Sequence, residues 1–273
     1  MTIVQGVALF VAAMLGGALN SVAGGGSFLT FPMLIFSGVP SINANATSTV
    51  ALWPGSVASV GAYRAELAHV RHRVLLSAVS VVGGGLGAIL LLKTPTATFT
   101  AAIPYLLLLA TLLFAFNGPI TDIVRRSRRA ASGSPTVDGA TPGGRTAEGV
   151  TSPRAVAAVA AAQLVIATYG GYFGGGIGIL MLATLGLMGM ERLHTMNALK
   201  TLLATCINGV AVVLFVLAHA VEWPQATVML VAAILGSYGS ARYALRIDQR
   251  LLRRIVVAVG LIRTVYFFVT THR

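Results

Sequence analysis

Gly24-Gly25-Gly26-Ser27 interrupts the first long apolar stretch of the chain, and Gly174-Gly175-Gly176 interrupts a later one. Glycine is about 1 kcal/mol less favourable than alanine at each position inside a helix. Three in a row predict a helix break, which frees backbone N–H and C=O groups at membrane depth. Such groups are tolerated there only inside protein or beside a watery cavity. Paired breaks are typical of a transporter's binding site, although glycines also let membrane helices pack closely.

The composition is that of a polytopic membrane protein. Of the 273 residues, 56% are hydrophobic and only 10% are charged, and the mean hydropathy is +0.85. A soluble domain has about 25% charged residues. The net charge of +12 does not indicate nucleic-acid binding, because most Lys and Arg lie between apolar runs, where the positive-inside rule places them. The lipid bilayer is therefore an expected partner, and nucleic acid is not.

The predicted fold is an all-α bundle of about eight hydrophobic segments. Two of the apolar runs, 28–37 and 179–188, are too short to span a bilayer alone and belong with the glycine-broken run before each. The apolar runs are 3–22, 28–37, 42–63, 74–92, 97–116, 155–168, 179–188, 193–218, 223–245 and 251–269.

An abrupt change of composition divides the chain at its middle. Residues 117–153 contain a basic cluster at 125–129, followed by Gly, Ser, Thr, Pro and Ala with almost no large apolar side chain. This composition is typical of a flexible polar linker, here on the cytoplasmic side. The expected organisation is a first membrane repeat at 1–116, the linker at 117–153, and a second membrane repeat at 154–273.

The second half retraces the first half at a nearly constant offset. The glycine triplets lie 150 residues apart, and the Asn-Ala pairs that begin at Asn45 and Asn197 lie 152 apart. Gly84 and Gly236 are also separated by 152 residues. Three anchors in register predict an internal duplication, with two residues inserted between the first and second anchors.

The number of membrane crossings decides how the two repeats are oriented. Four simple crossings in each half would make the repeats parallel and place the basic cluster at 242–254 outside, against the positive-inside rule. If each glycine-broken segment turns back, the repeats are inverted. The clusters at 64–73, 125–129 and 242–254 then all face the cytoplasm, and both termini lie outside. The inverted arrangement is therefore the prediction.

Lys200 is the strongest candidate for a binding residue. It follows Arg192 by eight residues, which places it about 12 Å into an apolar run. A lysine at the centre of a membrane helix costs roughly 2.5–3.5 kcal/mol, so such charges usually face a pathway. The alternative is a side chain that snorkels to the interface. Asn197 and Thr201 fall on or near the same helix face.

The predicted site combines amides, hydroxyls, one ammonium group and the backbone N–H groups freed at the glycine breaks. Donors of this kind suit an anion, so a small anionic substrate is expected, with neither a cofactor nor a metal. No carboxylate lies deep in an apolar run, which argues against a proton relay. The predicted substrate-binding residues are Gly24, Gly25, Gly26, Ser27, Asn43, Asn45, Ser48, Gly174, Gly175, Gly176, Asn197, Lys200 and Thr201.

These motifs resemble the TauE/SafE (sulfite exporter-like) family of bacterial membrane permeases. The resemblance covers both halves and rests on four stretches, 23–28, 45–48, 174–179 and 197–200. It implies a multi-pass transporter of the bacterial inner (cytoplasmic) membrane. Such a protein would export small sulfur-containing anions, such as sulfite or sulfonates, by alternating access between its repeats. Lys200 stands where the first repeat has Ser48, so a family-wide substrate does not carry over directly.

Two other classes of protein compete with a transporter. A structural or assembly membrane protein is the main alternative. An intramembrane serine protease would need a nucleophile in a Gly-x-Ser-Gly setting with a histidine partner on a helix. Ser27 is followed by Phe28, and no histidine lies deep in an apolar run. The chain is therefore not expected to be an enzyme.

Overall fold

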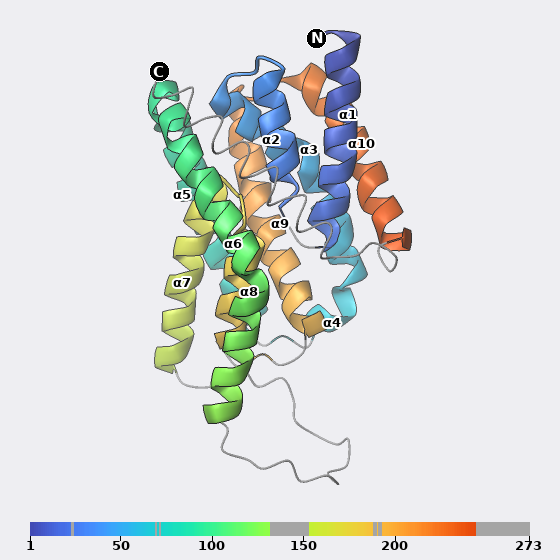
Figure 1. The fold of residues 1–273 in the computed structure, drawn as a ribbon. Coiled ribbons are helices and arrows are strands. Elements are labelled where there is room, and N and C mark those ends of the chain that lie inside the picture. Colours follow the sequence, from blue (N-terminus) through green and yellow to red (C-terminus); the bar gives the residue numbers. More distant parts are fainter. Residues whose placement is uncertain are drawn as a thin grey trace.

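The computed structural model describes residues 1–22, 25–68, 70, 72–131, 153–187, 190 and 193–243, and every regular element in these residues is a helix (Figure 1). Four stretches are long and apolar enough to cross a membrane, and they belong to α1, α5, α6 and α9. The helices are α1 (Ile3–Val22), α2 (Ser27–Phe36), α3 (Ser41–Ala62), α4 (Arg64–Ala68), α5 (Arg73–Lys93), α6 (Thr96–Ala131), α7 (Pro153–Tyr172), α8 (Ile177–Leu187), α9 (Leu193–Leu217) and α10 (Trp223–Tyr243).

The apolar runs predict these helices closely, and α1 has the bounds of the first run. The described residues form ten helices instead of about eight segments, for two reasons. The short runs form the separate helices α2 and α8, and the basic loop contains the five-residue α4. The last predicted run, 251–269, lies outside the described residues.

Helix α6 continues to Ala131, beyond the predicted start of the linker at residue 117. The prediction followed the loss of large apolar side chains, which ends a membrane span. A helix does not have to end there, because arginine and alanine are among the best helix formers. The helical conformation of 117–131 thus departs from the predicted flexible linker, whose residues 132–152 lie outside the described part of the chain.

Both glycine triplets break a helix in the way the sequence predicts. Helix α1 ends at Val22 and α2 begins at Ser27, while α7 ends at Tyr172 and α8 begins at Ile177. Gly25 has a φ of 111°, and Gly174 and Gly176 have φ values of 76° and 78°. Only glycine adopts this backbone region readily, so these positions turn the chain back in a tight hairpin. Gly24 lies outside the described residues.

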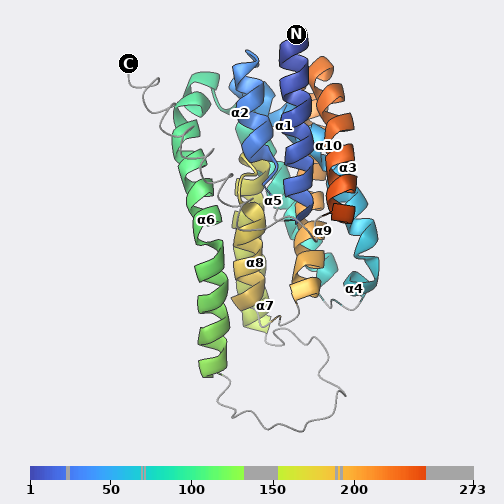
Figure 2. The ribbon, with the colours of Figure 1, turned by 45° about the vertical axis from the view of Figure 1, so that its right-hand side comes forward.

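The two hairpins enter the bundle from opposite ends. Helix α1 starts beside the N-terminus and runs toward the middle, and α2 leads back to the same end (Figures 1 and 2). Helix α7 starts at the other end, where α6 finishes, and also runs toward the middle. Between them, α3 and α9 pack against each other and cross the centre of the bundle.

Glycines allow the closest contacts between helices of the two halves, where α5 packs on α7 and α1 packs on α10. A Cβ on Gly87 would overlap the carbonyl oxygen of Thr168, and a Cβ on Gly236 would overlap that of Met14. Inside a bilayer no hydrophobic effect drives helices together, so they associate through the van der Waals contacts that such close approach allows. These two contacts therefore hold the glycine-broken hairpins in the bundle.

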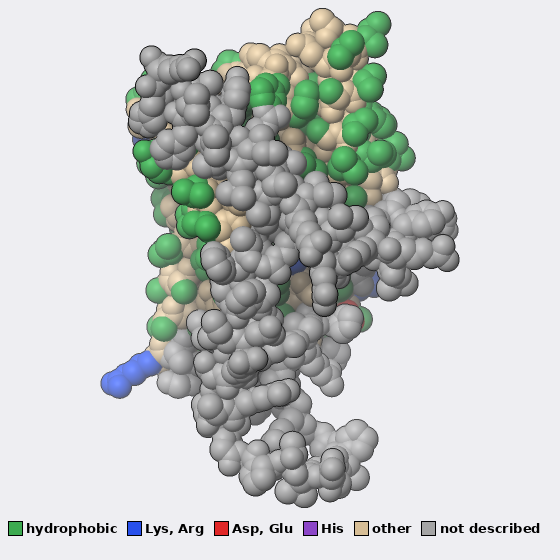
Figure 3. All heavy atoms as spheres, viewed as in Figure 1, with side chains coloured by type: hydrophobic (Ala, Val, Ile, Leu, Met, Phe, Trp, Pro, Cys, Tyr) green, Lys and Arg blue, Asp and Glu red, His purple; other side chains and the backbone are tan. Residues whose placement is uncertain are grey.

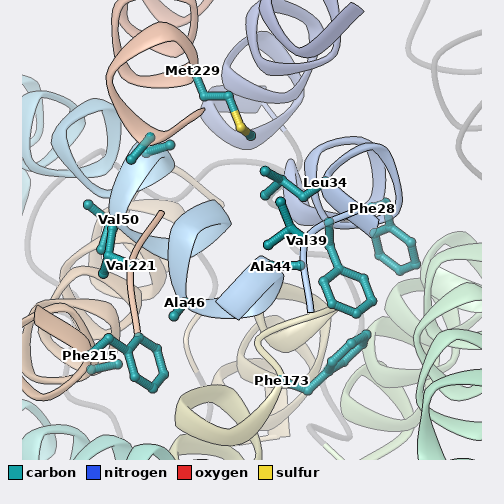
Figure 4. Packing of buried hydrophobic residues seen from close by; sticks show 14 of the residues in the cluster. Phe28, Leu34, Val39, Ala44, Ala46, Val50, Phe173, Phe215, Val221 and Met229 are labelled. Carbon is teal, nitrogen blue, oxygen red and sulfur yellow. The ribbon is translucent and has the colours of Figure 1, made fainter. Parts of the chain in front are cut away.

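The remaining surface and core follow the pattern of a membrane bundle. Large apolar side chains are exposed on the outside of the helices, among them Val4, Val74, Val165 and Val231. Figure 3 shows hydrophobic side chains over much of the described surface near the N-terminus. Phe31, Phe99 and Phe215 are almost fully buried inside, in a cluster of which Figure 4 shows part.

Replacing Gly236 by alanine is expected to lower the free energy of unfolding by about 1–3 kcal/mol, because the added methyl group overlaps the α1 backbone. Gly61→Ala is the matched control, since a Cβ at Gly61 on α3 meets no neighbouring atom. It should leave stability unchanged or raise it by up to about 1 kcal/mol. Thermal unfolding in detergent measures both, and equal effects would contradict the close contact of α1 with α10.

Candidate functional site

The two glycine turns face one another across a cavity in the bundle. The cavity has a volume of about 60 Å³, which is enough for several water molecules at about 10–15 Å³ each. The first turn contributes Gly25 and Ser27, and the second contributes Phe173, Gly174, Ile177 and Gly178. Helices α1, α3 and α9 supply the rest of the wall, which consists of Asn20, Thr49, Leu52, Gly55, Ser56, Ser59, Lys200, Thr201, Ala204 and Asn208.

Lys200 provides the charge in this wall. Helix α9 holds its side chain inside the bundle, where it is only 7% exposed. Among the described residues it has no carboxylate partner, and no lining residue of the cavity is acidic. A buried ammonium group without a counter-charge is costly, because it has lost most of its hydration. Because the side chain is buried, it does not snorkel to the surface. Because its charge is unpaired, the cavity is electrostatically suited to an anion.

Hydroxyl groups on α3 and α9 form part of the polar wall. Thr49 Oγ1 donates to Asn45 O at 2.8 Å, and Thr201 Oγ1 donates to Asn197 O at 2.7 Å. Both bonds reach back one helical turn, which fixes the side-chain rotamers. The structure thus gives α3 and α9 matching hydroxyls at the cavity.

A second polar contact connects α1 to α3 beside the same cavity. Asn20 Nδ2 donates to Ser56 Oγ at 3.0 Å, and both residues line the wall. Asn20 lies near the end of α1, shortly before the glycine turn, so this bond holds the end of the broken helix against α3. Hydrogen bonds therefore fix the orientation of part of the wall, on α1, α3 and α9.

Only part of the predicted site lies in this wall. The structure places Gly25, Ser27, Gly174, Lys200 and Thr201 there. The other predicted residues in the described part of the chain do not line this cavity, and these are Gly26, Asn43, Asn45, Ser48, Gly175, Gly176 and Asn197.

The three predicted residues of α3 connect the helix to its neighbours. Ser48 Oγ lies 2.6 Å from Thr30 Oγ1 of α2, and Asn45 Nδ2 donates to Tyr172 O at 3.2 Å. Asn43 Nδ2 donates to Glu222 Oε1 at 3.2 Å, at the start of α10. Asn45 lies one turn before Thr49 on the same side of α3, but its amide bonds to the end of α7, and the cavity begins at Thr49.

Two of the remaining predicted glycines, Gly26 and Gly175, shape the backbone of the turns. A Cβ on Gly26 would overlap the carbonyl oxygen of Gly16, so α1 and α2 touch at this point. Gly175 O accepts a hydrogen bond of 2.8 Å from the hydroxyl of Tyr169, which satisfies a carbonyl in the second turn. Both glycines therefore shape the hairpins, whereas Gly25 and Gly174 face the cavity.

Sequence reasoning missed Asn20, Thr49, Ser56, Ser59 and Asn208. A signal for most of them exists in the spacing of small and polar residues. On α3 the lining positions are 49, 52, 55, 56 and 59, and on α9 they are 200, 201, 204 and 208. Steps of three and four residues mark one face of a helix, so each stripe could have been found inside its apolar run.

An aromatic cluster lies beside the cavity and contacts it through Phe173. Phe173 borders both the cavity and a second pocket beside α2 and α6, which has no space for a water-sized molecule. Its ring meets that of Phe31 edge to face at a centroid distance of 5.6 Å, and Phe99 packs in turn against Phe31 and Tyr172. Figure 4 shows Phe28 and Phe173 together, on the side of the cluster away from Phe215.

Apolar spanning helices, two broken helices and a buried cation beside a cavity are the architecture of a membrane transporter. The family described as "Sulfite exporter TauE/SafE" matches residues 9–267, and the chain belongs to this family. It is thus a multi-pass membrane protein of a transporter family and not an enzyme.

Relatives in three groups of bacteria share nearly the whole length of the chain. The probable membrane transporter protein YfcA of Escherichia coli (strain K12) is 27% identical over 97% of this chain and 90% of its own. The probable membrane transporter protein ORF9 of Sinorhizobium sp is 26% identical over 93% and 88%. A probable membrane transporter protein of Haemophilus influenzae (strain ATCC 51907 / DSM 11121 / KW20 / Rd) is 26% identical over 94% and 91%. No solved structure matches the chain.

Replacing Lys200 by methionine is expected to stabilise the empty protein, because it removes an unpaired charge from the interior. The gain in unfolding free energy is at most about 3 kcal/mol, the cost of a lysine at membrane depth. Lys93→Met is the matched control, since Lys93 is exposed at the end of α5 and should change stability little. Thermal unfolding without added anions compares them, and a less stable Lys200→Met protein would show that Lys200 has an unseen partner.

Proposed function

We propose that this protein moves small sulfur-containing anions, such as sulfite or sulfonates, across the bacterial inner membrane, with Lys200 as the fixed positive charge of the binding site. The observation that carries this proposal is the buried ammonium group, which has no carboxylate partner among the described residues and lines a cavity between two glycine turns. A substrate anion would supply the missing counter-charge.

The ends of two half-helices support an anion as the substrate. Helix α2 starts at Ser27 and α8 starts at Ile177, and both residues line the cavity. Phe28 N–H and Ile179 N–H already donate to the turn carbonyls of Gly25 and Gly176. The N–H groups before them lack partners within the helix, and the helix dipole adds partial positive charge at that end. Broken helices in transporters direct such N-termini at anionic substrate groups. Three positive features thus converge on one small space.

Export is the direction that this chemistry favours. An anion that leaves a cell with a negative interior gains about 2.3 kcal/mol per charge for each 100 mV of membrane potential. Such a flux needs no embedded carboxylate to carry protons, and the apolar runs contain none. The requirement is a site that lowers the cost of dehydrating the anion, which a fixed ammonium group meets.

The proposed mechanism is alternating access between two inverted repeats. The cavity wall supports it, because the lining residues pair at the offsets found in the sequence. Ser27 and Ile177 are 150 residues apart. The wall also contains three pairs at an offset of 152, which are Thr49 with Thr201, Leu52 with Ala204 and Ser56 with Asn208.

Contacts outside the cavity wall also join positions that correspond at these offsets. Trp53 Nε1 donates to Thr205 O at 3.1 Å, and these two positions are 152 residues apart. The packing of α5 on α7 has its counterpart in the packing of α10 on α1, with the hairpins entering from opposite ends. Repeats related in this way can exchange conformations, so that a cavity closed toward one side opens there as the other side closes.

Transport also agrees better with the relatives than a structural or assembly role does. The curated relatives are named as probable membrane transporters, and each aligns over most of its own length. A purely structural protein would have no need for a buried, unpaired cation, which destabilises the fold.

Lys200→Met is expected to abolish sulfite flux from proteoliposomes, because the anion then loses its counter-charge in the cavity. Lys93→Met should transport at the wild-type rate, since Lys93 is exposed at a helix end. Lys200→Arg should transport with a changed preference among anions, because a planar fork replaces a compact charge. Normal sulfite flux through Lys200→Met would remove Lys200 from the site.

The inverted arrangement predicts opposite membrane sides for the N-terminus and the end of α6. In a Cys206→Ser background, Thr2→Cys should react with an impermeant maleimide on intact cells, and Ser127→Cys only after lysis. The reason is that the basic end of α6 is retained in the cytoplasm. Labelling of both positions from the same side would favour parallel halves and contradict the inverted repeats.

A further inference from the structure

The hydroxyl groups of the cavity wall are not interchangeable, because their protons are already assigned. A hydroxyl has one proton to donate and two lone pairs. Thr49 and Thr201 give their protons to the helix carbonyls of Asn45 and Asn197. Ser59 does the same, with a bond of 2.9 Å to Gly55 O. While they keep these bonds, the three hydroxyls offer only lone pairs to a molecule in the cavity.

Another part of the wall offers donors. Ser56 Oγ accepts a hydrogen bond from Asn20 Nδ2, and among the described residues no acceptor takes the Ser56 proton. That proton and the three protons of the Lys200 ammonium group are available to a ligand. The cavity thus has donors on Lys200, Ser56, Ser27 and the Asn208 amide, and hydroxyl oxygens that act as acceptors on Thr49, Thr201 and Ser59.

This division decides which anions the wall can satisfy. A fully deprotonated anion with only acceptor oxygens matches Lys200 and Ser56, but it leaves the threonine lone pairs without a partner. Its oxygens would also face those lone pairs at close range in a dehydrated space, where unsatisfied polar groups are costly. An anion with its own O–H or N–H group can donate to Thr49 or Thr201 while its charged end meets Lys200.

We propose that the site selects anions that also carry a hydrogen-bond donor, such as a monoprotonated oxyanion or a hydroxysulfonate, over acceptor-only anions of equal charge and size. This inference rests on the proposed anion transport and narrows its substrate class. The selecting groups are the hydroxyl oxygens of Thr49 and Thr201, which face the cavity from the two central helices. One further hydrogen bond in a buried site corresponds to a preference of about tenfold.

A pair of matched sulfonates tests the proposal. Hydroxymethanesulfonate and ethanesulfonate have the same charge and the same number of heavy atoms, and differ by a hydroxyl in place of a methyl group. Calorimetric titration of the purified full-length protein at pH 6 should show about tenfold tighter binding of hydroxymethanesulfonate. Thr49→Val combined with Thr201→Val should bind both sulfonates with equal affinity, because valine keeps the shape and removes the acceptors.

The controls separate this effect from general damage. Thr184 on α8 also donates to a carbonyl one turn back, Leu180 O at 2.9 Å, but does not line the cavity. Thr184→Val should therefore keep the preference. Thr49→Ser and Thr201→Ser retain a hydroxyl, so each should keep it as well. The single Thr49→Val and Thr201→Val proteins serve if the double valine protein does not fold, and each should show a smaller preference than the wild type.

The possible results distinguish a failure of donor selection from a failure of the proposed anion transport. Equal affinities in the wild type, or a preference that survives in the double valine protein, would overturn the donor selection. Binding of ethanesulfonate that disappears in Lys200→Met would still support an anion site in that case. Failure of the wild type to bind either sulfonate would overturn both proposals.

Discussion

The need to satisfy backbone groups inside a bilayer governs this fold. Each glycine turn ends a helix in the middle of the bundle, so the freed N–H and C=O groups must find partners within the protein. Some do so locally, since Thr30 Oγ1 donates to Gly26 O and Tyr169 donates to Gly175 O. Phe28 N–H and Ile179 N–H also donate to turn carbonyls, so at the starts of α2 and α8 only the N–H groups before them are left to face the cavity. The same break that would be costly in lipid therefore creates a polar site, provided that α3 and α9 enclose it.

Stability and binding oppose each other at Lys200. The corresponding position of the first half is Ser48, whose hydroxyl is satisfied by Thr30 and which costs little to bury. Lys200 has no such partner among the described residues, so its buried charge is not compensated. Two similar halves can therefore share one scaffold while only one of them carries the charge. A second lysine at the position of Ser48 would repel the first, so the difference in this one side chain keeps a single positive charge near the cavity.

The positions of the helices could be predicted from the sequence, but the side chains that face the cavity could be predicted only in part. Apolar runs and glycine breaks locate α1, α2, α7 and α8, because membrane depth leaves few other solutions. The extension of α6 was missed since helix propensity continues after hydrophobicity stops. Lys200 could be singled out by its cost alone. The stripe that contains Thr49 has a signal in its spacing, but Asn45 and Ser48 continue the same steps of three and four residues, and tertiary packing decides which of these positions reach the cavity.

The aromatic side chains near the cavity are distributed unequally between the two halves of the sequence. Phe28 and Phe31 of the first half correspond, at the offset of 150, to Gly178 and Met181. Phe173 of the second half corresponds to Ala23. The rings from both halves thus meet on one side, where Phe31 and Phe173 pack edge to face, while the corresponding positions in the other half carry smaller or more flexible residues. Edge-to-face pairs add about 0.5–1.5 kcal/mol beyond the area they bury. Under the proposed alternating access, this distribution would favour the conformation with the packed rings, because the exchanged conformation has no equivalent rings to stabilise it.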